Sequence, residues 1–121
     1  MKESGEMYLE SIYLLSKEKN AVRSIDIAEH MNYSKPSVSR GVKLLKENGY
    51  ISIDNEGFIT LTKEGEDCAN KIFERHTILT KLLMSFGIDE KTASMDACRM
   101  EHVISDKSFS AMKKYVKNTF K

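Results

Sequence analysis

The chain has 121 residues, 40% of them hydrophobic and 31% charged, with a formal net charge of +1, which suits one compact domain or two small modules. It contains no apolar run long enough to span a bilayer and no charged, apolar leader, so we expect a cytoplasmic protein with no membrane partner. Two cysteines, Cys68 and Cys98, are too few for a disulfide scaffold, so reduced thiols are expected.

The first 31 residues predict two helices. Residues 4–17 place apolar side chains at helical spacing with glutamates between them, and Ser4 is the expected N-cap. Ser24 is then expected to cap a short helix that ends at Met31. The stretch NYS that follows predicts a tight turn.

A third helix follows this turn. Ser34 is its expected N-cap, and Pro36 lies in the first turn, where proline is tolerated. Gly49 is the expected C-terminal stop. The residues predicted to face inward are Val38, Val42 and Leu45.

The sequence pattern changes after the third helix. Residues 50–62 alternate apolar and polar on both sides of DNEG, which predicts a two-stranded hairpin. Two short helices joined by a tight turn and followed by a hairpin are typical of a winged helix-turn-helix, in which the second helix enters the DNA major groove.

Three further helices are expected after the hairpin. Thr62 opens a long one that runs through about Phe86, with Gly65 as an early weak point. The next covers roughly residues 89–104, and the last starts at Asp106 or Ser108.

The third helix has the composition of a DNA-recognition helix. Between residues 34 and 48 it carries four basic side chains and one acid, a local charge of +3. Arginine and lysine attract phosphate and contact guanine, and small hydroxyl side chains allow close approach. Alone, such a face is more often a solvated surface, but the turn and the hairpin favour DNA binding, although the hairpin tip is acidic. The candidate contact residues are Ser34, Lys35, Pro36, Ser37, Ser39, Arg40 and Lys43.

A second group of residues has the chemistry of a metal site. Cys98, Glu101 and His102 are three and four residues apart, which places them on one face of the predicted helix. Nitrogen, oxygen and sulfur donors together suit a first-row divalent ion rather than Ca²⁺ or Mg²⁺. Further candidates on other helices are Met7, Glu10 and His76.

Each of these residues also has a purely structural interpretation. A lone methionine such as Met7 is usually part of a core, and a lone Cys98 is more often a small buried hydrophobe than a ligand. His76 alone is more often a hydrogen-bonded helix histidine.

Five segments carry a resemblance to a known family: GEMYLESIYLL, VRSIDIAEHMNYSKPSVSRGVKLLKENGYI, LTKEGE, RHTILTKLL and DACRMEHVIS. In this order they resemble the metal-dependent repressors of the diphtheria-toxin-repressor and manganese-transport-regulator type. The resemblance implies a mainly α fold, with a winged helix-turn-helix DNA-binding domain over residues 1–62 and a helical metal-binding and dimerisation domain over residues 63–121. The chain ends where longer, iron-type members begin an SH3-like domain.

The resemblance also implies ligand roles. Thr80 and Ser94 stand where iron-type members carry an acid and a histidine of an ancillary site. Sulfur ligands favour softer ions, so Fe(II) is the expected metal, and an added carboxylate keeps Mn(II) as the second candidate. Met7 and Cys98 match the iron type, Glu10 matches the manganese type, and His76, Glu101 and His102 agree with both.

The function implied is a repressor of metal-uptake genes that binds a palindromic operator as a metal-loaded homodimer. A winged-helix regulator of a non-metal ligand is the alternative. An enzyme that uses Cys98 and His102 is disfavoured because no oxyanion-hole loop accompanies them. The apolar residues that predict a dimer are Ile72, Ile78, Leu79, Leu82, Leu83, Phe86, Phe109, Met112, Tyr115, Val116 and Phe120.

Overall fold

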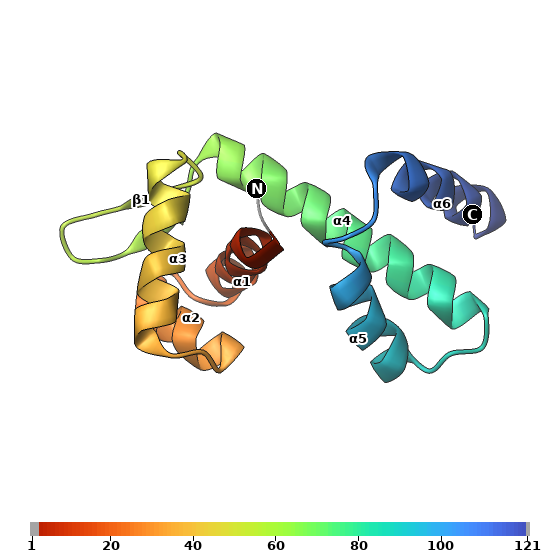
Figure 1. The fold of residues 1–121 in the computed structure, drawn as a ribbon, viewed down its shortest axis with the longest axis horizontal. Coiled ribbons are helices and arrows are strands. Elements are labelled where there is room, and N and C mark those ends of the chain that lie inside the picture. The colour runs from red at the N-terminus through yellow and green to blue at the C-terminus, as the bar shows by residue number, and fades with distance from the viewer. Residues whose placement is uncertain (1–2, 121) are drawn as a thin grey trace. The chain divides into compact units, whose positions relative to one another are not determined.

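The structure is a computed structural model that describes residues 3–120, except for the side chain of residue 3. Over these residues the order of elements is three helices, two strands and three helices, as the sequence predicts (Figure 1). The chain divides into two compact units, the first ending at Asn70 and the second beginning at Lys71. Among the described residues, no helix is both long and apolar enough to cross a bilayer.

The first unit is built on three helices that pack against one another: α1 (Glu3–Glu18), α2 (Ser24–Met31) and α3 (Lys35–Glu47). Their apolar faces form its core, because helical spacing places those side chains on one side of each helix. The residues predicted to face inward from α3 are all buried, as are Leu9, Ile12 and Ile27 from the other two helices.

The helix ends confirm one predicted cap and correct two. The Ser34 side chain accepts a hydrogen bond from the Ser37 N–H, 3.3 Å away, and so caps α3 as predicted. Ser4 lies inside α1 and is not its N-cap. Ser24 is the first residue of α2, because the Asp26 carboxylate accepts from the backbone N–H of Arg23, 2.8 Å away, and closes that helix start instead.

The predicted hairpin consists of β1 (Ile51–Ile53) and β2 (Ile59–Leu61), paired antiparallel with Ile53 opposite Ile59. Ile59 also forms an isolated antiparallel bridge with Val22, which lies just before α2. Sequence patterns did not predict this bridge, because a single residue has no periodicity.

Helix α4 (Lys63–Ser85) follows the hairpin, and the Thr62 hydroxyl accepts from the Gly65 N–H, 3.1 Å away, at its start. The helix continues without a break through Gly65, which the sequence suggested as an early weak point. A Cβ at this position would lie 1.9 Å from the carbonyl oxygen of Tyr50, so only glycine allows the helix to approach the hairpin so closely.

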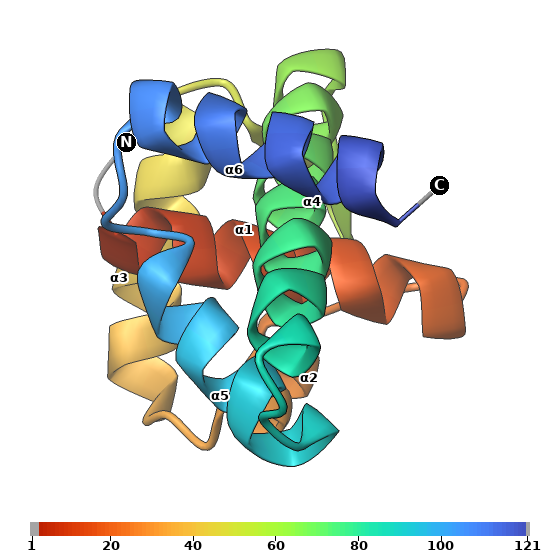
Figure 2. The same ribbon diagram turned by 90° about the vertical axis from the view of Figure 1, so that its right-hand side faces the viewer.

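The second unit contains the rest of α4 together with α5 (Glu90–Met100) and α6 (Asp106–Thr119). Figure 2 shows α6 crossing α4. The core at this crossing consists of Ile78 and Leu82 from α4 and Phe109 and Val116 from α6, with Ile104 and Met112 packed against it.

Both short helices of this unit begin with a side-chain cap. Asp89 accepts from the Thr92 N–H, 3.0 Å away. This hydrogen bond, followed by one from the Thr92 side chain, holds the pKa of Asp89 below its usual value. Ser105 accepts from the Ser108 N–H, 3.1 Å away, so Asp106 is the first residue of α6, one of the two predicted starts. Helix α5 ends at Met100, earlier than predicted.

Candidate metal centre and recognition helix

A buried carboxylate lies at the centre of the candidate metal site in the second unit. The Glu101 side chain is 0% exposed, and its two oxygens face two imidazole rings. His76 Nδ1 lies 3.0 Å from Oε2, and His102 Nε2 lies 3.2 Å from Oε1. The His102 side chain is itself 1% exposed. Two predicted ligands from different parts of the chain therefore converge on a third.

Cys98 belongs to the same group. It lies in the last turn of α5, is half-buried, and places its Sγ within 4.8 Å of a carboxylate oxygen of Glu101. The structure thus gathers around Glu101 the three other candidate ligands that the sequence suggested for this part of the chain.

The local backbone differs from the single helical face that the sequence suggested. Glu101 is the C-cap of α5, and its N–H still bonds to the Ala97 carbonyl at 2.9 Å, so it keeps the helical three-residue relation to Cys98. His102 lies in the turn beyond the helix. Its ring is directed by this turn rather than by helical periodicity.

Arg75 on α4 supports this turn, and sequence reasoning missed it. Its Nη1 donates to the carbonyl oxygens of Glu101 and Ile104, at 3.1 and 3.0 Å, and its Nη2 pairs with the Asp106 carboxylate. Helix C-termini leave carbonyls that need donors, but the sequence does not show which donor reaches them. Arg75 therefore holds the backbone that carries Glu101 and His102.

Two hydroxyl side chains contact His76, one at its ring and one at its backbone carbonyl. Ser94 Oγ lies 3.3 Å from His76 Nε2, and Thr80 donates to the His76 carbonyl at 2.7 Å. A second partner on the ring fixes the orientation of an imidazole that binds metal through its other nitrogen. The two residues that stand in place of ancillary ligands thus contact His76.

The donor set in this unit fits a first-row divalent ion. A buried carboxylate needs a compensating positive charge, and two imidazoles and a thiol beside it are donors that such ions accept. The hard, oxygen-only surroundings that Ca²⁺ prefers are not found among these four residues.

Met7 and Glu10 lie on α1 in the first unit, and both are half-buried. Between them, Tyr8 and Leu9 enter the core of that unit. Burial raises the pKa of Tyr8 above its usual value, with a smaller contribution from Tyr33.

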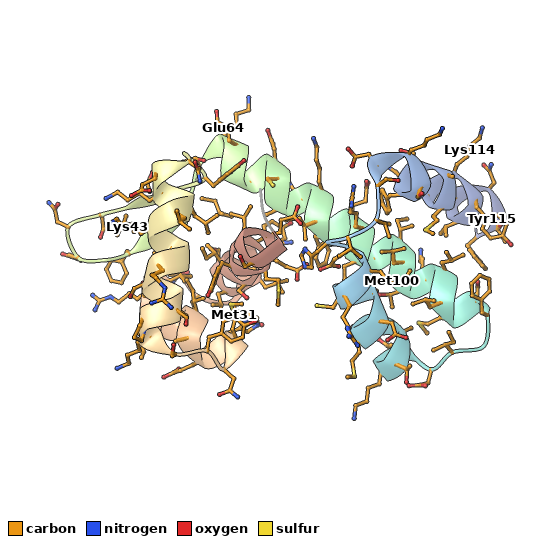
Figure 3. All side chains as sticks on the ribbon, viewed as in Figure 1. Met31, Lys43, Glu64, Met100, Lys114 and Tyr115 are labelled. Carbon is orange, nitrogen blue, oxygen red and sulfur yellow. The ribbon has the colours of Figure 1, made fainter. Side chains whose placement is uncertain are left out.

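The predicted DNA-contact residues lie on the exposed side of α3 and its preceding turn, where Figure 3 labels Lys43. Ser37 is half-buried, and its hydroxyl contacts two other residues of this face, Ser34 and Arg40. Its hydroxyl lies 2.9 Å from that of Ser34 and accepts from Arg40 at 3.4 Å. The exposed members are Ser34, Lys35, Pro36, Ser39, Arg40 and Lys43.

A cation that sequence reasoning also missed lies against the hairpin from the start of α2. The guanidinium of Arg23 lies 4.4 Å from the centre of the Phe58 ring. At the acidic tip, the Asp54 carboxylate accepts from the N–H groups of Glu56 and Phe58, both at 2.9 Å. Asp54 therefore stabilises the turn, and Arg23 places a positive charge over the Phe58 ring.

Comparison with known proteins identifies two family models along the chain. Residues 1–57 match the iron dependent repressor N-terminal DNA binding domain. Residues 62–119 match the iron dependent repressor metal binding and dimerisation domain.

Relatives match over most of the chain. An HTH-type transcriptional regulator of Methanocaldococcus jannaschii is 38% identical over 93% of this chain and 92% of its own length. The HTH-type transcriptional regulator MntR of Lysinibacillus sphaericus is 34% identical over 84% and 73%, respectively. The diphtheria toxin repressor of Corynebacterium glutamicum is 32% identical over 86% of this chain but only 46% of its own length.

Solved structures show the same architecture. The manganese regulator SloR superimposes with a TM-score of 0.83 at 29% identity, over 97% of this chain and 55% of SloR. A hypothetical protein from Sulfolobus solfataricus, with a TM-score of 0.75 at 21% identity, covers 98% of this chain and 91% of its own.

Proposed function

This chain belongs to the iron-dependent repressor family, and from that premise we propose that it represses metal-uptake genes by binding a palindromic operator as a metal-loaded homodimer. Proteins of this family are metal-dependent, DNA-binding transcriptional repressors and are not enzymes. The observation that carries the proposal is the buried carboxylate of Glu101 between the imidazoles of His76 and His102. Such a repressor would act in the cytoplasm, where its operator is.

The proposed ligands come from both parts of the chain. His76, Cys98, Glu101 and His102 would supply the donors of the second unit. We propose Met7 and Glu10 on α1 as the remaining ligands, because their three-residue spacing places both on one face of that helix. A bound divalent ion supplies positive charge that compensates the buried carboxylate and holds its ligands in a defined arrangement.

Fe(II) is the proposed metal, with Mn(II) as the second candidate. Two sulfur-bearing residues, Met7 and Cys98, favour a softer ion, whereas the carboxylate of Glu10 suits Mn(II). A relative named MntR and the manganese regulator SloR support the second candidate.

The proposed DNA-binding domain covers residues 1–62, and the proposed metal-binding and dimerisation domain covers residues 63–121. In the first, the exposed face of α3 would enter the major groove, with Lys35, Arg40 and Lys43 near phosphates and base edges. In a two-fold dimer, two such helices must lie roughly 34–36 Å apart to reach successive major grooves. Metal binding and DNA binding are then linked, and each strengthens the other by the same factor.

The second unit exposes apolar side chains that support a dimer. Several of the residues that predicted a dimer, such as Phe109 and Val116, instead fill the core of this unit. Others remain on the surface, as Tyr115 does in Figure 3. A set of exposed apolar side chains on one small unit indicates a partner surface. Four of its members are Met84, Phe86, Tyr115 and Phe120, at 42%, 65%, 54% and 43% exposure.

The test is operator binding by the protein purified without metal. Under anaerobic conditions, titration with Fe(II) or Mn(II) should restore binding to a palindromic DNA in a gel-shift assay, and a chelator should abolish it. His102→Ala should lose both stoichiometric metal and DNA binding. Equal DNA binding before and after chelation would overturn the proposal and favour a regulator of a non-metal ligand.

A further inference from the structure

Tyr8 connects the helix that carries Met7 and Glu10 to the recognition helix of the same unit. Its side chain is 7% exposed, and its hydroxyl donates to the backbone carbonyl of Ser37 in the first turn of α3, 3.2 Å away. Its ring also meets the ring of Tyr33 edge-on, with centroids 6.0 Å apart. One residue of α1 thus touches both the turn before α3 and the first turn of that helix.

The absence of a side chain at Gly41 leaves room for the Tyr8 ring against α3. A Cβ at Gly41 would lie only 2.3 Å from a ring carbon of Tyr8. Glycine is unfavourable inside a helix, so its position in the middle of α3 is explained by this close approach of the ring. The hydroxyl and the ring of Tyr8 therefore contact α3 one turn apart, which defines how α3 lies against α1.

A cavity beside the contact between Tyr8 and Gly41 leaves room for the Tyr8 ring to move. A cavity of about 460 Å³ is lined by Tyr8, Gly41, Gly5 and Leu44, among others. The ring is packed against α3 on one side and borders this cavity on another. A shift of α1 can therefore be followed by a movement of the ring, instead of being blocked by a filled core.

The Tyr8 hydroxyl bonds to a residue, Ser37, that takes part in several interactions at the start of α3. Besides accepting from Tyr8, it caps the helix start with Ser34 and receives a hydrogen bond from Arg40 on its hydroxyl. The position of the Ser37 backbone therefore affects both the start of the recognition helix and the direction of an exposed cation.

We propose that Tyr8 is the positioning residue through which α1 sets the first turn of the recognition helix, and so couples metal binding at Met7 and Glu10 to DNA binding. This inference rests on the proposed function. Tyr8 directly follows Met7, and successive side chains on a helix point about 100° apart. The neighbouring ligand and the contact to α3 thus share one rigid segment, and an effect on one is passed to the other.

The test compares Tyr8→Phe with the wild type in three measurements under anaerobic conditions: metal affinity without DNA, operator affinity with metal and operator affinity without metal. Tyr8→Phe keeps the ring and loses only the hydrogen bond to Ser37. The ratio of operator affinities with and without metal should fall about fivefold, as expected for one neutral hydrogen bond. Metal affinity without DNA should stay at the wild-type value.

Two further variants make the result specific. Gly41→Ala displaces the ring from the other partner, and it should lower the same ratio without touching any proposed ligand. Tyr13→Phe removes a hydroxyl from the same helix, and it should leave the ratio unchanged. The amide signal of Ser37 in an NMR spectrum should shift on addition of Zn²⁺ in the wild type and shift less in Tyr8→Phe.

The outcomes separate this inference from the proposed function. An unchanged ratio in Tyr8→Phe, with metal-dependent DNA binding intact in the wild type, would overturn the role of Tyr8 alone. A lowered melting temperature with an unchanged ratio would likewise show a merely structural role. DNA binding that does not depend on metal in the wild type would overturn both proposals.

Discussion

The guanidinium of Arg75 donates to the backbone carbonyl of Glu101 over 3.1 Å, so the main chain of the most buried candidate ligand is held by a side chain from α4. The same nitrogen also bonds to the Ile104 carbonyl at 3.0 Å, which closes the turn between α5 and α6. Since His102 lies in this turn, Arg75 supports two of the proposed ligands while its own side chain stays outside the ligand set.

We expect Arg75→Lys to weaken metal binding. A lysine ammonium cannot reproduce the planar fork that serves two carbonyls and a carboxylate. Affinity should fall about tenfold, the lower end of the range for residues that orient metal ligands. Competition with a chelator under anaerobic conditions measures this. Arg99→Lys on the exposed side of α5 is the matched control, and equal affinities for both variants would contradict the role of Arg75.

Glu101→Gln should abolish the increase in melting temperature that metal causes in the wild type. The amide keeps the shape of the side chain but removes the charge that a divalent ion compensates. Without metal, the variant should melt no lower than the wild type, because an uncharged group costs less to bury than a carboxylate. Thermal melts with and without Mn(II) test this, with Glu90→Gln at the start of α5 as an exposed control. A metal-induced increase that survives in Glu101→Gln would count against the proposed centre.

Gly65→Ala should destabilise the first unit by about 1–3 kcal/mol, the usual cost of forcing an extra methyl group into a packed site. The added Cβ would meet the Tyr50 carbonyl oxygen, and neither backbone can move without breaking the start of α4. Urea denaturation measures the change. Glu64→Ala, one residue earlier on the exposed side of α4 and labelled in Figure 3, should be close to neutral.

The stability contributed by Asp26 should disappear in acid. The side-chain hydrogen bond from Lys19, 2.8 Å away, and the backbone N–H of Arg23 hold the pKa of Asp26 below its usual value. A lowered folded pKa stabilises the fold above the unfolded pKa of about 3.9, and this stabilisation is lost as the pH falls through the folded pKa.

Asp26→Asn should therefore be less stable than the wild type at pH 7, and the difference should shrink below about pH 4. Urea denaturation of the metal-free protein at a series of pH values gives this profile. Asp67→Asn on the exposed side of α4 is the control for a general loss of negative charge. A difference that is constant with pH would contradict the assignment.

Arg40→Ala should weaken operator binding and reduce the dependence of affinity on salt. Removing one phosphate contact lowers the slope of log affinity against log salt by about 1. Fluorescence anisotropy with the metal-loaded protein at several salt concentrations measures this slope. Lys114→Ala on α6, labelled in Figure 3, removes the same charge from the second unit and should leave the slope unchanged. Equal effects of the two variants would show that net charge, rather than the α3 face, governs binding.

Predictions that depend on residues close together in the sequence were more accurate than those that depend on distant residues. The N-cap at Ser34 and the hairpin around DNEG were predicted correctly, because each depends on residues a few positions apart. The predicted N-cap of α2 was wrong, because the helix begins at Ser24 itself, with the Asp26 carboxylate accepting from the N–H of Arg23. The end of α5 was wrong because Arg75 satisfies the carbonyls of the turn from another helix.

The sequence by itself determined the order of the elements and the kinds of donor atom available, because periodicity, caps and turn residues act over one or two turns of chain. Only the tertiary structure decided which groups meet. It placed His76 against Glu101, twenty-five positions away, and Tyr8 against Gly41. Such pairings depend on how whole helices pack, and the free energy of packing is shared among many distant side chains, so no short stretch of sequence specifies them.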